Sequence, residues 1–167
     1  MTPPDPAPDL AALQDALRDR LRELAPALEA ATLAETGHTA RPYGVALRFP
    51  GGQSAYIQIM RAGVPGADRP DAPGDRAPNP APVFAPGHAQ VRTADLETLL
   101  AAALATLPAP LCAQGTPISP TARPGGFPFG VRARYPGGTA LWLLPFLLLA
   151  PGEQPAKRLQ HLYPAAF

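Results

Sequence analysis

The chain contains few residues of several types, and each shortage excludes a class of protein. Its 167 residues include one cysteine, Cys112, so no internal disulfide can form and a reducing compartment is expected. Lysine occurs once, at Lys157, and arginine supplies the other 13 basic residues, for a net charge of only +1. A near-neutral chain without a lysine-rich tract lacks the long-range attraction that drives nucleic-acid binding.

Signals for export or membrane insertion are also missing. The sequence opens Met1-Thr-Pro-Pro-Asp-Pro, without the basic and apolar segments of a signal peptide. The longest apolar run, residues 140–150, contains Pro145 and is far shorter than the roughly 20 residues that cross a bilayer. We therefore expect a cytoplasmic protein with no membrane partner. The 25 prolines and the preference for arginine are typical of a high-GC bacterial genome, so composition is weak evidence about function.

No catalytic, cofactor or metal signature is present. The three histidines, His38, His88 and His161, lie far apart and have no second ligand at metal spacing. Neither of the two serines, Ser54 and Ser119, lies in a nucleophile motif, and the paired glycines do not open helices as phosphate loops do. We therefore predict no catalytic, cofactor or metal residues. An enzyme that binds a small ligand between the two halves of the chain stays a third hypothesis, without a residue set.

The chain does contain a repeated segment. Residues 42–56 align without a gap on residues 128–142, which lie 86 positions further on. Over residues 42–60, seven of 19 positions are identical, where about two would match by chance. The same offset aligns Asp9 with Asp95 and the leucines that follow them. The sequence predicts an internal duplication in which each copy is a helix followed by a β-hairpin. A Pro-Gly-Gly hairpin that arose twice is the alternative.

The length suits one domain with an ordinary hydrophobic core. Residues 1–8 are proline-rich and predict a disordered leader. The single domain then covers residues 9–167, as pseudo-repeats of about 9–60 and 95–146. A proline-rich excursion over residues 61–82 joins them, because this stretch is too poor in apolar residues to fold alone.

Leucines at spacings of three and four after Asp9 predict the first helix. Pro26 should kink or restart that helix, and Gly37 should end it. A second helix is expected at about residues 95–107, and a short terminal helix at residues 153–162. A third strand is expected within residues 83–91.

The Pro50-Gly51-Gly52 sequence predicts a three-residue hairpin loop in which Phe49 faces Gln53. In that register the apolar residues of both hairpins share one core face. They are Tyr43, Val45, Leu47, Phe49, Ala55, Ile57 and Ile59 in the first copy and Phe129, Val131, Ala133, Tyr135, Leu141 and Leu143 in the second.

The outer faces of the hairpins carry the candidate binding residues. These are arginines and aromatic or apolar side chains, namely Arg48, Tyr56, Arg132, Arg134, Trp142, Leu144 and Phe146. Arg132 should lie directly opposite Trp142, in a position to stack on it. Pro145 cannot donate a ladder bond, so the strand that contains it should lie at a sheet edge or break. Its apolar outer row should be covered by another segment or another chain.

The predicted order of elements is helix, two strands and a further strand, then helix, two strands and helix. This is an α+β arrangement with an antiparallel sheet and helices packed on it, and it resembles the secretion-chaperone-like fold. The resemblance implies a dimer that binds extended segments of other proteins. We therefore predict a non-enzymatic, homodimeric protein-interaction module, with a single-stranded nucleic-acid-binding protein as the alternative because arginine beside aromatic rings also holds single strands.

Overall fold

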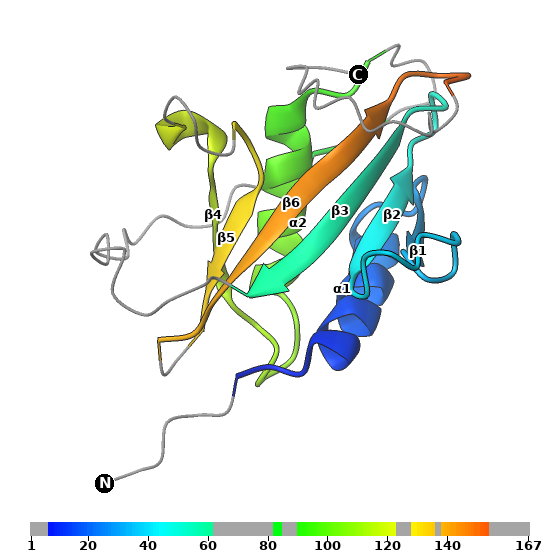
Figure 1. Cartoon of the computed structure of the whole chain (residues 1–167). Helices are drawn as coiled ribbons and strands as arrows, with labels where there is room; N and C mark the ends of the chain where they lie inside the picture. Colours follow the sequence, from blue (N-terminus) through cyan, green and yellow to red (C-terminus); the bar gives the residue numbers. More distant parts are fainter. Residues whose placement is uncertain (1–6, 62–81, 85–89, 123–127, 136–137, 154–167) are drawn as a thin grey trace, which may run out of the picture.

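The fold is α+β, with two helices packed on an open, six-stranded antiparallel sheet (Figure 1). The computed structural model describes residues 7–61, 82–84, 90–122, 128–135 and 138–153. The elements in chain order are α1 (Leu10–Leu24), β1 (Glu29–Thr32), β2 (Gly44–Arg48), β3 (Ser54–Arg61), α2 (Thr93–Ala105), β4 (Gln114–Pro117), the 3-10 turn η1 (Ser119–Thr121), β5 (Val131–Arg134) and β6 (Ala140–Leu149). The strand order in the sheet is β1-β2-β3-β6-β5-β4, so β3 and β6 pair at its centre.

The first helix ends earlier than the leucine spacing predicts. It begins where the Asp9 side chain accepts a hydrogen bond from the Ala11 N–H at 3.1 Å, and it ends at Leu24. The prediction that Pro26 kinks or restarts the helix was wrong, because a proline disfavours helical backbone in the residue before it. The chain turns after Ala25 instead and forms β1, which pairs antiparallel with β2.

Gly37 does end a helical turn, but a separate one that follows β1. It adopts a positive φ of 85°, and its N–H donates to the Ala34 carbonyl at 3.1 Å. The next N–H, of His38, donates to the Leu33 carbonyl at 3.0 Å. This pair of bonds is the Schellman motif, in which glycine is favoured. The turn redirects the chain from β1 into the long loop that precedes β2.

The predicted hairpin register is confirmed. The Phe49 N–H donates to the Gln53 carbonyl at 2.9 Å, and Gly52 has a φ of 93°. In the second hairpin the Tyr135 N–H donates to the Thr139 carbonyl, also at 2.9 Å. Because this register is fixed, alternate residues of β2, β3, β5 and β6 point to opposite faces of the sheet.

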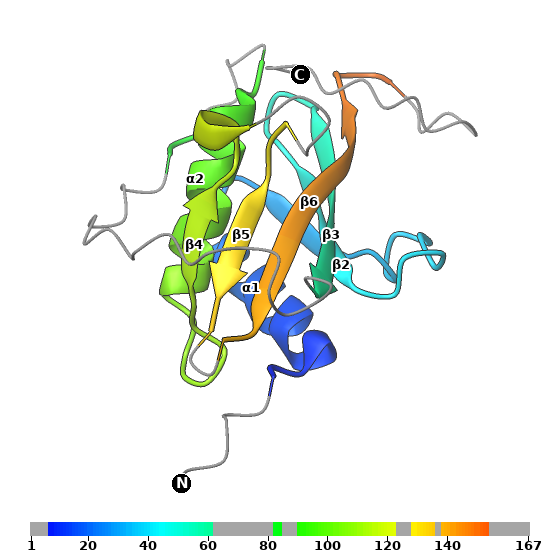
Figure 2. The same cartoon turned by 60° about the vertical axis from the view of Figure 1, so that its left-hand side comes forward.

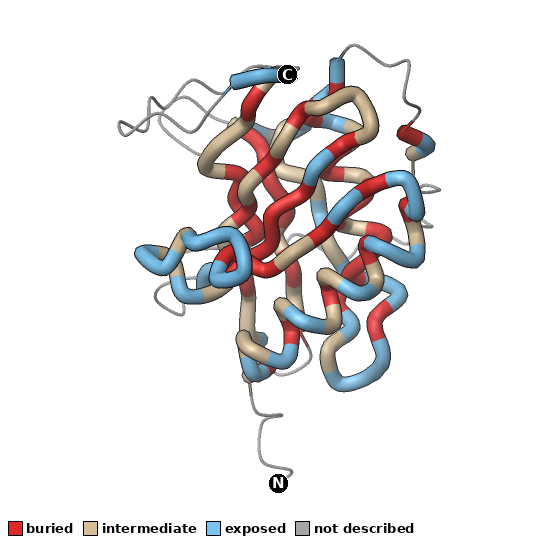
Figure 3. The backbone as a smooth tube through the Cα atoms, turned by 90° about the vertical axis from the view of Figure 1, so that its right-hand side faces the viewer, coloured by how far each residue is buried: buried red, intermediate tan, exposed pale blue. Residues whose placement is uncertain are grey.

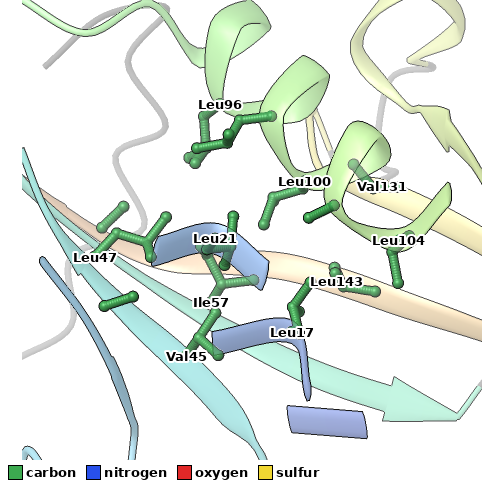
Figure 4. Packing of buried hydrophobic residues seen from close by; sticks show 14 of the residues in the cluster. Leu17, Leu21, Val45, Leu47, Ile57, Leu96, Leu100, Leu104, Val131 and Leu143 are labelled. Atoms are coloured by element: carbon green, nitrogen blue, oxygen red, sulfur yellow. The ribbon is translucent and has the colours of Figure 1, made fainter. Parts of the chain in front are cut away.

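One face of the sheet carries the hydrophobic core, and both helices lie on that face (Figure 1, Figure 2). Leucines of α1 and α2 converge there on apolar strand residues (Figure 4). The labelled residues are Leu17, Leu21, Leu96, Leu100 and Leu104 from the helices and Val45, Leu47, Ile57, Val131 and Leu143 from the strands. The predicted core face is thus buried, and exposed positions gather on loops and outer helix faces (Figure 3). In the described part of the chain, no helix covers the opposite face.

Of the two outcomes predicted for the strand with Pro145, the edge position is wrong, whereas the ladder is indeed interrupted beside Pro145. β6 is central and pairs with β3 over its length and with β5 at its start. Its register against β3 shifts, so that Tyr56 pairs with Leu147 and Ile57 with Pro145, which leaves Phe146 as an extra residue. A bulge accommodates a proline inside a sheet because the ladder is already interrupted there.

Two strands, β1 and β4, were not predicted. Each is four residues long and forms an edge of the sheet. The strand predicted within residues 83–91 is not seen at residues 83–84 or 90–91, and residues 85–89 lie outside the described part. The terminal helix, most of the leader and almost all of the excursion also fall outside it. None of the helices in the described residues has the length and apolar character needed to span a bilayer.

Candidate interaction surface

The helix-free face of the sheet, opposite α1 and α2, carries three aromatic side chains on the two central strands. Tyr56 lies on β3, and Trp142 and Phe146 lie on β6. Their neighbours Ile57 and Leu143 are fully buried on the core side. The alternation of the strands, with the bulge at Phe146, therefore directs the aromatic rings away from the core.

The loop between β1 and β2 completes an aromatic cluster on this face. The His38 ring centroid lies 4.6 Å from that of Tyr56 and 6.2 Å from that of Phe146. The Tyr56 and Phe146 centroids are 6.3 Å apart. Because these separations fall in the range of favourable ring contacts, the three side chains form one cluster.

Arg41, from the same loop, covers one side of that cluster. Its guanidinium carbon lies 4.2 Å from the centroid of the Phe146 ring, a cation–π geometry. Its Nη1 also donates to the Gln58 Oε1 on β3. Neither His38 nor Arg41 could be placed on this face from the sequence, because their positions depend on the path of a loop, which no periodicity predicts.

The predicted pairing of Arg132 with Trp142 is confirmed. The two residues are directly opposite in the β5–β6 ladder, and the guanidinium carbon lies 5.6 Å from the indole ring centroid. This pair belongs to the same face as the aromatic cluster. Two arginine–aromatic contacts therefore occur on the helix-free face.

The other predicted site residues differ in exposure. Arg48 on β2 is exposed, and Arg134 on β5 is half-buried. Leu144 is buried, with 6% of its surface exposed, because its side chain packs beside Gly130. The chain itself therefore covers part of the apolar row on β6 that we expected to need a cover.

Charge is distributed unevenly between the two faces. Four arginines that belong to or flank the helices each lie 3.7 Å or less from an aspartate or glutamate side chain. They are Arg18, Arg20, Arg22 and Arg92. Three arginines on the helix-free face have no aspartate or glutamate side chain within 4 Å among the residues that the structure describes. They are Arg41, Arg48 and Arg134. Three arginines on one face that have no carboxylate within 4 Å favour a negatively charged ligand there.

A buried carboxylate on the other side of the molecule was also missed. Glu97 of α2 has 1% of its surface exposed, and its Oε1 accepts hydrogen bonds from the Ser119 N–H at 2.9 Å and the Gly130 N–H at 2.8 Å. Its Oε2 accepts from the Ser119 hydroxyl. Because protein donors satisfy both oxygens, Glu97 fixes the ends of the β4–β5 connection and is not placed as a general base.

Comparisons with models of protein families, with curated proteins and with solved structures found no match to this chain. Within the described residues, no group of three or more histidine, cysteine, aspartate or glutamate side chains could hold a metal ion.

Proposed function

We propose that the protein is a non-enzymatic interaction module that binds an acidic, extended segment of another protein on the helix-free face of its sheet. The observation that carries this proposal is the set of arginines on that face, Arg41, Arg48 and Arg134, which have no carboxylate oxygen within 4 Å among the described residues. A carboxylate of the partner would supply the missing charge, because planar guanidinium groups match carboxylates in shape and hydrogen bonding.

The composition of the face supports a protein partner. Aromatic rings and Met60, which is 39% exposed, lie on the central strands, and arginines lie around them. Protein interfaces are enriched in tyrosine, tryptophan, phenylalanine, methionine and arginine, with apolar residues in the centre and a polar rim. The fold class that the element order resembles also binds extended segments of other proteins.

Single-stranded nucleic acid is the second candidate, with Arg48, Tyr56, Arg132, Arg134 and Trp142 as its binding residues. Arginines beside aromatic rings suit phosphate contacts and base stacking. It is less favoured for two reasons. The net charge is only +1, and Arg41 already occupies a position over the Phe146 ring that a base would need.

The homodimer remains a prediction. If two copies met through their helix-free faces, Arg48 and Arg134 of one copy would approach the like charges of the other, which is unfavourable. A second copy is therefore a less suitable occupant of this face than an acidic segment.

We also propose that the two halves arose by duplication. Gly44 begins β2, and Gly130, 86 positions further on, directly precedes β5. Both glycines have a positive φ. The Gly44 N–H donates to a side-chain oxygen of α1, that of Gln14, at 3.2 Å. The Gly130 N–H donates to a side-chain oxygen of α2, that of Glu97, at 2.8 Å. The donors occupy equivalent positions, but the acceptors do not, because an offset of 86 aligns Gln14 with Leu100 and Glu97 with Ala11. The proposal of a duplication therefore depends on the repeated sequence and on the matching glycines.

The proposed function predicts that reversing two charges on the helix-free face abolishes most binding. Fluorescence anisotropy would measure binding of a labelled, alternating glutamate–tyrosine peptide to wild type and to R48E with R134E. We expect the double variant to bind at least about tenfold more weakly. The reason is that the two introduced glutamates repel the carboxylates of the peptide, which the arginines attract. A lysine–tyrosine peptide of equal length should not bind to wild type.

The matched control is R20E with R92E, which changes the net charge equally away from the helix-free face, and it should bind the peptide nearly as well as wild type. Oligothymidylate provides the second arm. Tighter binding of oligothymidylate, lost in R48E with R134E, would favour the nucleic-acid candidate. No binding of either probe, or equal loss in both double variants, would refute the proposed function.

A further inference from the structure

β1 is an edge strand, and half of its backbone groups point away from the sheet. The Leu33 N–H donates to the Gly44 carbonyl at 3.0 Å, so Leu33, Ala31 and Glu29 are the positions that face β2. In an antiparallel ladder the residues between them direct their N–H and C=O groups outward. Ala30 and Thr32 therefore present the groups on which another strand would pair.

Arg22 occupies one of the two outward carbonyls of this edge, that of Ala30. Its Nε and Nη2 donate to the Ala30 carbonyl oxygen at 2.9 Å and 2.6 Å. The side chain comes from the last turn of α1, and its Nη1 lies 3.7 Å from the Asp19 carboxylate. The guanidinium thus stands where an incoming strand would place a backbone N–H.

Glu35 occupies one of the two outward N–H groups, that of Thr32. Its Oε2 accepts a hydrogen bond from the Thr32 N–H at 2.6 Å, and its own N–H donates to the Thr32 Oγ1 at 3.3 Å. This reciprocal pair is a capping box, Thr-Leu-Ala-Glu, at the start of the turn that follows β1. Hydrogen bonding from the Thr32 backbone, then from its side chain, lowers the pKa of the Glu35 carboxyl, so it is ionised near neutral pH.

The opposite edge, β4, is also poor in donors. The Ile118 N–H donates to the Gly130 carbonyl, so Ala113, Gly115 and Pro117 are the outward positions. The Ala113 N–H donates to the Leu104 carbonyl at 3.2 Å, and proline has no N–H. At most one of these three positions, Gly115, can offer an N–H to another strand.

We propose that Arg22 and Glu35 keep the β1 edge closed against strand pairing with a second copy of this chain. The two side chains reproduce one donor and one acceptor that an added strand would bring, at the Ala30 carbonyl and the Thr32 N–H. A second copy can pair fully with both Ala30 and Thr32 only after it displaces a guanidinium and a carboxylate that are already bonded. Arg22 and Glu35 lie outside the proposed binding face, so a test of this proposal is independent of the proposed function.

The test is to remove both side chains beyond Cβ in R22A with E35A. Sedimentation velocity over a range of concentrations should show self-association at least about tenfold tighter than in wild type, because the outward groups of Ala30 and Thr32 become available. Hydrogen exchange should show new protection of these residues in the associated form. The control, R20A with E23A, removes an exposed ion pair of α1 with the same change in charge and should sediment as wild type does.

R22M provides a second test in case the double variant does not fold. Methionine keeps most of the length of the arginine side chain but has no hydrogen-bond donor. R22M should also self-associate, more weakly than the double variant. The proposal is overturned if R22M and the folded double variant sediment as wild type does. It is also overturned if wild type already self-associates with residues 29–32 protected.

Discussion

Gly44→Ala is expected to lower the free energy of unfolding by about 3 to 5 kcal/mol, through backbone strain and a steric clash together. Gly44 has a φ of 156°, and a Cβ there would lie 2.2 Å from the Ile57 carbonyl oxygen and 2.6 Å from the Leu33 Cδ1. Both neighbours are part of the packed structure, so neither can move without disturbing the β2–β3 ladder or a buried leucine. Urea unfolding would measure the change.

The control for this variant is Gly37→Ala. Gly37 has a φ of 85°, but a Cβ there would meet nothing within 4 Å, so only the cost of the left-handed backbone applies, about 1 to 2 kcal/mol. Gly130→Ala should resemble Gly44→Ala, because its Cβ would lie 2.7 Å from the Leu143 carbonyl oxygen. Equal stability of the Gly44 and Gly37 variants would contradict the close approach at Gly44.

Glu97→Ala should also be strongly destabilising, with a loss of about 3 to 4 kcal/mol. It leaves two backbone N–H groups and the Ser119 hydroxyl without their acceptor, and each buried donor left unpaired costs about 1 to 3 kcal/mol. The estimate lies at the lower end of the sum because Ser119 is only half-buried and water can reach it. Urea unfolding of the variant would again give the change in free energy.

Glu97→Gln is the matched variant, since its amide oxygen can still accept from the Ser119 and Gly130 N–H groups. It should lose about 1 to 2 kcal/mol, and hydrogen exchange at those two amides should stay slow. In Glu97→Ala the same amides should exchange faster than the rest of the sheet. If the two variants are equally stable, the hydrogen bonds of Glu97 do not hold the β4–β5 connection.

The hairpins could be predicted because their information is local. A Pro-Gly-Gly loop sets the register, and the register decides which side chains alternate to each face. That reasoning identified the core residues of β2, β3, β5 and β6, and it placed Arg132 opposite Trp142. Every one of these positions depends only on its own strand and on the strand next to it in sequence.

The edges of the sheet could not be predicted because they depend on tertiary pairing. β1 has the sequence Glu-Ala-Ala-Thr, in which only threonine favours strands, and it becomes a strand because β2 offers it a ladder. Pro145 indicated an edge, but the bulge at Phe146 allows it inside the sheet. His38 and Arg41 joined the candidate site for the same kind of reason, since the turn ended by Gly37 directs their loop onto the helix-free face.

The most direct test of the proposed function is to map where the glutamate–tyrosine peptide binds. Arginine Nε–Hε resonances, followed by NMR during a titration, report on each guanidinium separately. We predict that the signals of Arg41, Arg48 and Arg134 shift with one common affinity, while those of Arg20 and Arg92, which lie away from the helix-free face, stay in place. Shifts confined to Arg20 and Arg92, or no shift at any arginine at saturating peptide, would contradict the assignment of the helix-free face as the binding surface.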